Sequence, residues 1–151
     1  MKSISLLSEK FEAPEFQKWV SNCKVTDKRF FLDNNIDLEL FVHIGKFIFP
    51  NFIEVKGLIF IEELVDPALI NPSSSHLSLE EYQASFNRLS LAIYFNQSAS
   101  CSNDLWNAAL EITKVGWLHS LKKLYPNIEF VVQTSHEEAY DPYILFYQKQ
   151  A

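Results

Sequence analysis

The chain has 151 residues, of which 48% are hydrophobic and 15% aromatic, and its formal net charge is −6. This length is typical of one domain, and the apolar content argues against an intrinsically disordered chain. The acidic balance without a basic cluster argues against a nucleic-acid-binding domain. Because the two cysteines form no paired motif and the N-terminus has no signal-peptide pattern, we expect a cytoplasmic protein. We also expect no membrane-spanning segment and no cofactor.

The first third of the chain is predicted to begin with a short helix and to continue as strands. Pro14 suits the first turn of a helix, and apolar residues at helical spacing follow it. The apolar segment 29–32 leads into an Asp-Asn-Asn sequence that favours a turn. Between residues 36 and 42 every second residue is aliphatic, which predicts a strand with one buried face. Residues 47–49 are expected to be a further extended segment, because a proline follows them.

The next segment has the pattern of a β-hairpin. Residues 52–55 and 58–61 are separated by Lys56-Gly57, which suits a two-residue turn. The second arm is apolar at every position, so both of its faces are expected to be covered. We therefore predict that this hairpin forms the centre of the sheet.

A capping box predicts a helix in the middle of the chain. The Ser78 hydroxyl and the Glu81 carboxylate, three residues apart, can satisfy each other's free backbone donors at a helix start. Beyond Asn87 an alternating pattern competes with a helical one. We expect the helix to change into an extended segment after Leu89.

The longest predicted helix begins at Ser102 or Asn103 and ends near Leu124, before a proline. Gly116 within it is expected to permit close packing. Trp106, Leu110 and Trp117 widen its apolar stripe, so much of the circumference is expected to be buried. The stripe itself comprises Leu105, Ala108, Ala109, Ile112, Val115, Leu118 and Leu121.

The chain closes with a predicted antiparallel hairpin of residues 128–134 and 143–148. The order of elements is a helix, several strands, two helices and two strands, which is not a regular alternation of strand and helix. We therefore predict an α+β fold over residues 1–151, a single domain with a mainly antiparallel sheet packed against two or three helices.

Three residues around the first hairpin form a candidate nuclease site. Glu54 and Lys56 occupy alternate positions, and Asp37 comes from a preceding predicted strand. This pattern resembles the PD-(D/E)xK nucleases. The resemblance implies that Asp37 and Glu54 hold Mg²⁺ while Lys56 orients the attacking water. The alternative is a solvent-facing row on a hairpin.

Two further patterns suggest ligands. His136, Glu137, Glu138 and Asp141 are a candidate metal site, but no other histidine has ligand-like spacing to them, which favours the alternative of a solvated hairpin loop. The many aromatic residues can build either a packed core or a pocket for a small molecule or lipid, and the pocket requires a cavity of a few hundred Å³.

An acidic segment points to a protein partner. Between Lys56 and Arg88 there is no lysine or arginine. We expect a protein-binding module, similar in general character to bacterial immunity proteins, which neutralise a cognate toxin by direct binding. The partner would be a basic protein, and complementary charge would speed its association. The residues predicted to bind it are Glu62, Glu63, Asp66, Glu80 and Glu81.

Overall fold

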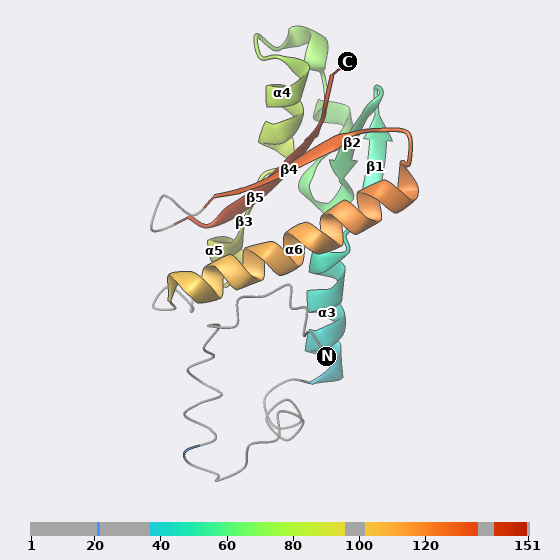
Figure 1. Ribbon diagram of the computed structural model, residues 1–151. Helices are drawn as coiled ribbons and strands as arrows, with labels where there is room; N and C mark the ends of the chain where they lie inside the picture. The colour runs from blue at the N-terminus through green and yellow to red at the C-terminus, as the bar shows by residue number, and fades with distance from the viewer. Residues whose placement is uncertain (1–20, 22–36, 96–101, 136–140, 151) are drawn as a thin grey trace, which may run out of the picture.

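The chain folds as an α+β structure in which a long helix packs across a small antiparallel sheet (Figure 1). The computed structural model describes residues 21, 37–95, 102–135 and 141–150, so the helix predicted after Pro14 and the segment 29–32 lie outside the described part. The described helices are α3 (Leu38–Ile48), α4 (Leu79–Phe86), α5 (Leu91–Tyr94) and α6 (Asn103–Leu124). The described strands are β1 (Phe52–Val55), β2 (Leu58–Ile61), β3 (Leu89–Ser90), β4 (Phe130–Ser135) and β5 (Tyr143–Gln148). Three 3₁₀ turns follow β2: η1 (Glu62–Leu64), η2 (Pro67–Leu69) and η3 (Pro72–Ser74).

The strands form two separate antiparallel sheets. β1 pairs only with β2, whereas β5 lies between β3 and β4 in the second sheet. Both predicted hairpins are therefore confirmed, and Lys56 (φ 53°) and Gly57 (φ 78°) make the left-handed two-residue turn of the first. The prediction that this hairpin is the centre of one sheet is wrong, because β5 occupies the central position of the larger sheet.

Residues 38–42 of the segment predicted as a strand are instead the start of α3. Asp37 is the N-cap of this helix, and its Oδ1 accepts a hydrogen bond from the Leu40 amide at 2.7 Å. Residues 47 and 48 are also helical, so the extended segment predicted there is wrong. The alternation of aliphatic residues misled the prediction, although Phe41 interrupts it and fits a helical pattern instead.

The capping box at Ser78 is present and begins α4. This helix ends at Phe86, and the chain then pairs with β5 over only two residues, Leu89 and Ser90. The extended segment predicted after Leu89 is wrong beyond Ser90, because residues 91–94 return to a helix. The Leu91 amide donates to the Pro142 carbonyl at 2.8 Å, which holds the start of α5 against the second sheet.

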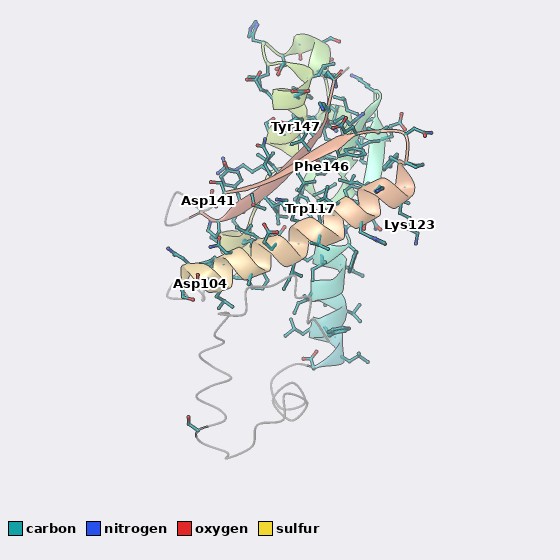
Figure 2. All side chains as sticks on the ribbon, viewed as in Figure 1. Asp104, Trp117, Lys123, Asp141, Phe146 and Tyr147 are labelled. Carbon is teal, nitrogen blue, oxygen red and sulfur yellow. The ribbon has the colours of Figure 1, made fainter. Side chains whose placement is uncertain are left out.

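Helix α6 has the predicted bounds, but only part of the predicted apolar stripe is buried. Leu110, Thr113, Trp117 and Leu121 are buried, whereas Ile112, Val115 and Leu118 are exposed. The helix carries apolar residues on two faces, and the face that holds Trp117 packs on β4 and β5. Figure 2 shows Asp104 and Lys123 at the opposite ends of α6, where their charges complement the helix dipole.

Gly116 confirms the predicted close packing. A Cβ atom at this position would collide with the side chain and the carbonyl of Ile48. The Trp117 indole also donates to the Phe47 carbonyl at 3.3 Å. α3 therefore crosses α6 at its own C-terminal end, as Figure 1 shows, while its N-terminal end projects away from the sheets.

Aromatic rings fill the core between α6 and the two sheets. The Phe146 ring meets the ring of Trp117 edge-on at 5.9 Å and that of Phe52 at 5.6 Å. Trp117 on α6 and Phe146 on β5 are labelled in Figure 2. A second, smaller cluster lies on the other face of β2, where Phe60 packs against Phe86 of α4. Because both faces of β2 are covered, all four of its residues are buried, as its sequence predicted.

A buried polar cluster of Gln83, Asn87 and Gln148 joins the two sheets. The edge of β2 away from β1 would otherwise bury unpaired backbone groups. Instead, the Ile59 amide donates to Gln148 Oε1 at 2.7 Å, and the Ile61 amide donates to Asn87 Oδ1 at 3.0 Å. The Ile59 carbonyl accepts from Gln83 Nε2 at 2.6 Å and from Asn87 Nδ2 at 3.0 Å. Three side-chain amides therefore take the place of a neighbouring strand.

The members of this polar cluster also bond to one another. Gln83 Nε2 donates to Gln148 Oε1 at 2.8 Å, and the backbone N–H of Gln148 donates to Gln83 Oε1 at 2.7 Å. Gln83 and Asn87 are fully buried on α4, so this helix is fixed to β5 and β2 at once. The cluster could not be predicted, because Gln148 lies 65 residues beyond Gln83 along the chain.

Candidate functional site

The three residues of the candidate nuclease site do not form the predicted arrangement. Asp37 caps α3 instead of lying on a strand, and Lys56 lies in the hairpin turn. α3 has eleven residues and is therefore about 16 Å long. Its opposite end leads into β1, so the length of α3 separates Asp37 from Glu54 (Figure 1). Glu54 instead lies near Tyr125, whose pKa is raised by burial and by the Glu54 charge.

The candidate metal site is only partly described. His136, Glu137 and Glu138 lie outside the described residues. Both carboxylate oxygens of Asp141 are engaged, one by Arg88 at 2.9 Å and the other by the Ser90 hydroxyl. Within the described ranges, no group of three or more histidine, cysteine or acidic side chains is placed to hold a metal ion.

The predicted acidic residues separate into two groups. Glu62 and Glu63 are exposed on η1, and Asp66 follows as the N-cap of η2, where its Oδ1 accepts from the Ala68 amide at 2.9 Å. Glu80 and Glu81 lie in the first turn of α4. Asp66 therefore has a local structural role, whereas no hydrogen bond or ion pair joins the side-chain carboxylate of Glu62 or Glu63 to another part of the described chain.

The α4 carboxylates also serve the fold. Glu81 accepts from the Ser78 amide at 3.0 Å and from the Ser78 hydroxyl at 2.7 Å. These two hydrogen bonds favour the ionised form and lower the pKa of Glu81 below 4.5. Glu80 accepts from the Gln150 amide at 2.9 Å, near the C-terminus. Of the five predicted residues, Glu62 and Glu63 are thus the two without such a partner.

An exposed apolar surface, not singled out from the sequence, runs along α3. None of its eleven residues is buried, although most of them are apolar. Leu38 is 77% exposed and Phe41 is 65% exposed. Contiguous apolar surface on a folded protein commonly marks an interaction site. We call the following set the α3 surface: Leu38, Phe41, Val42 and Phe49, with Ile93 and Tyr94 of α5 and Ile112 and Val115 of α6.

Two contacts connect α3 to the two helices that carry the other members of this set. The Phe47 ring meets the Tyr94 ring edge-on at 5.4 Å, which joins α3 to α5. Gly116 lies against Ile48, and Ile112 is one turn before Gly116 on the same side of α6. The exposed apolar residues of α6 therefore border the crossing with α3. The Asp37 cap and the charges of Glu39 and Lys46 at opposite ends of the segment are the sequence signals that could have revealed this helix.

Two hollows are large enough for small ligands. The larger, of about 580 Å³, is an open groove between the end of α6 and the chain that leads into β4. The smaller, of about 230 Å³, is more enclosed and lies where α3, η1, α5 and α6 meet. Lys46, Glu63 and Tyr94 are among the residues that line it, above a floor that includes Trp117. This smaller cavity lies at the border of the α3 surface.

Comparison with family models, with curated proteins and with solved structures finds no match to this chain. Over the described part, no helix combines the length and the apolar character needed to cross a membrane.

Proposed function

We propose that this protein is a protein-binding module and that the α3 surface is its contact surface. The observation that supports the proposal is the exposure of α3, an apolar helix of eleven residues with none of them buried. The described part of the fold leaves this apolar helix face exposed to water. Burial of such a face against another protein lowers the free energy. The exposed phenylalanines Phe41 and Phe49 are suitable anchors, because aromatic side chains contribute strongly to interface affinity.

The proposed partner is a basic protein. Glu62 and Glu63 are exposed on η1, and Glu63 lines the cavity at the border of the α3 surface. The whole chain carries a net charge of −6, which favours approach of a positively charged protein. An immunity protein that neutralises a basic toxin in the cytoplasm by direct binding is the kind of module that these features favour. Asp66, Glu80 and Glu81 would add to the acidic field, while Asp66 and Glu81 maintain their helix caps and Glu80 holds the Gln150 amide.

The test is capture of a partner by the full-length protein, with three matched variants. The wild-type bait is expected to retain one stoichiometric partner from a lysate of the organism that encodes it. Phe41→Ala and Glu62→Lys/Glu63→Lys should each weaken capture by about tenfold or more. Leu69→Ala is the control, because Leu69 is 71% exposed on η2, outside the α3 surface, and it should leave capture unchanged.

Three results would contradict the proposal. The first is that the wild-type bait retains no stoichiometric partner. The second is that Phe41→Ala captures the partner as well as the control does. The third is that Phe41→Ala unfolds the free protein, because Phe41 would then belong to its core.

A further inference from the structure

The smaller cavity, beneath the C-terminal half of α3, is partly open and has an apolar floor. Phe47, Ile61, Leu89 and Trp117 line it, and the last three of these are buried in the fold. Its volume of about 230 Å³ exceeds the roughly 150 Å³ that accommodates benzene in an apolar protein cavity. It is smaller than the roughly 300–1,000 Å³ of pockets for drug-sized molecules. A ligand of this size would therefore be a small molecule with one apolar group of about the size of a ring.

The rim of this cavity carries unpaired groups of both charges. Lys46 and Glu63 line the cavity, yet neither forms an ion pair with the other or with any side chain in the described part of the protein. The Tyr94 hydroxyl, on the α5 side, likewise has no hydrogen bond to another described residue. His43 also lines the rim, and its Nε2 lies 3.8 Å from Glu39 Oε1, so this imidazole has a partner. The free charges of the rim are thus one ammonium and one carboxylate.

We infer that this cavity is a binding site for a free α-amino acid with an apolar side chain. The ligand carboxylate would bind the Lys46 ammonium, and the ligand ammonium would bind the Glu63 carboxylate. Its side chain would lie on the floor against Phe47 and Trp117. A zwitterion satisfies both free charges at once, whereas a ligand with only one charge leaves the other without a partner. This site goes beyond the proposed protein-binding function and does not depend on it.

The experiment compares three ligands of the same shape. L-phenylalanine carries both charges, 3-phenylpropionate lacks the amine, and 2-phenylethylamine lacks the carboxylate. Binding to the full-length protein is measured by isothermal titration calorimetry. Quenching or shift of tryptophan fluorescence is a second readout, since Trp117 lines the floor. L-phenylalanine is expected to bind about tenfold or more tightly than either analogue, because each analogue lacks one charge-assisted contact.

Two charge-removing variants assign the contacts. Lys46→Met should weaken L-phenylalanine and 3-phenylpropionate by about tenfold and leave 2-phenylethylamine unchanged. Glu63→Gln should weaken L-phenylalanine and 2-phenylethylamine and leave 3-phenylpropionate unchanged. The control is Glu62→Gln, an adjacent exposed carboxylate that does not line the cavity, and it should bind all three ligands as the wild type does.

The inference is overturned if L-phenylalanine causes no heat and no fluorescence change up to millimolar concentration. It is also overturned if the two analogues bind as tightly as L-phenylalanine, since the rim charges would then play no part. Equal effects of Glu63→Gln and Glu62→Gln would likewise contradict it. None of these results would affect capture of a protein partner by the α3 surface, so failure of the two proposals can be distinguished.

Discussion

The first hairpin and α3 are neighbours in the chain but are held in opposite ways. Every residue of β2 is buried, and the polar cluster of Gln83, Asn87 and Gln148 satisfies the edge of the strand. α3 has no buried residue and contacts the rest of the described fold chiefly where its last turn crosses α6. The hairpin is therefore fixed by contacts to α4 and β5, whereas α3 is attached mainly at one end.

This difference separates the parts that stabilise the protein from the part that can bind another molecule. Buried amides that replace a missing strand are costly to disturb, because each lost partner leaves a backbone group unpaired. Exposed apolar residues cost the free protein little when they are changed, but they supply area for a partner. Stability and binding should therefore respond to different substitutions.

The largest effect is expected in the polar cluster. Gln83→Met keeps the length of the side chain and removes its three hydrogen bonds. The backbone N–H of Gln148 then loses its bond to Gln83 Oε1. The free energy of unfolding should fall by about 3 kcal/mol. Urea denaturation measures this change. Gln133→Met, at an exposed glutamine of β4, is the control and should change stability by less than about 0.5 kcal/mol. Equal effects at the two positions would contradict the role of the cluster.

The second-largest effect is expected at the crossing where α3 packs against α6. Gly116→Ala would place a methyl group against the Ile48 carbonyl, and overpacking of this kind costs about 2 kcal/mol. Because the clash lies at the crossing, we expect faster amide hydrogen exchange in α3 and little change in β4 and β5. Gly45→Ala is the matched control, since a methyl group there meets nothing within 4 Å. Slowed or unchanged exchange in α3 for Gly116→Ala would show that this contact does not attach the helix.

Removal of the N-terminal caps of α4 and α3 should affect global stability to different extents. Ser78→Ala removes the capping box of α4, which is packed on β5, and should lower the stability of the whole fold by about 1 kcal/mol. Asp37→Ala removes the equivalent cap of α3. It should fray the first turn of α3 in hydrogen exchange with a smaller effect on global unfolding. Equal effects of both changes on the urea midpoint would argue that α3 is part of the same cooperative unit.

The smallest effect expected is a pH dependence at Glu81. Its pKa is lowered in the folded state by hydrogen bonds from Ser78, so the unfolded chain binds this proton more readily. The contribution to stability is therefore present above pH 4.5 and is lost as pH falls through the folded-state pKa. Thermal melts between pH 7 and pH 3 should show that Glu81→Gln has a smaller loss of stability on acidification than the wild type. An identical loss in both proteins would contradict this assignment.

Local signals in the sequence predicted the parts of the fold that depend on local chemistry. The Lys56-Gly57 turn, the Ser78 capping box and the bounds of α6 are each specified within a few residues. The start of α3 was mistaken for a strand because its apolar residues alternate between 36 and 42 before the helical pattern becomes visible. The Asp37 cap was the competing signal.

The parts that depend on distant contacts could not be predicted. α6 has two apolar faces, and only packing against β4 and β5 decides that Trp117 is buried while Ile112 is exposed. Similarly, Lys46 of α3 and Glu63 of η1 line the same cavity because the fold brings these two elements together. The acidic residues were selected as a binding surface by their charge, although the sequence had already placed Glu81 in the capping box with Ser78.

The most direct test of the account compares the stability of two phenylalanine variants, Phe41→Ala in α3 and Phe60→Ala in β2. Phe60 is fully buried, so its loss should lower the free energy of unfolding in urea by about 3–5 kcal/mol. Phe41→Ala should change this free energy by less than about 0.5 kcal/mol, because its ring is exposed. A loss of several kcal/mol for Phe41→Ala would contradict the account, since the ring would then be part of the core and not of a binding surface.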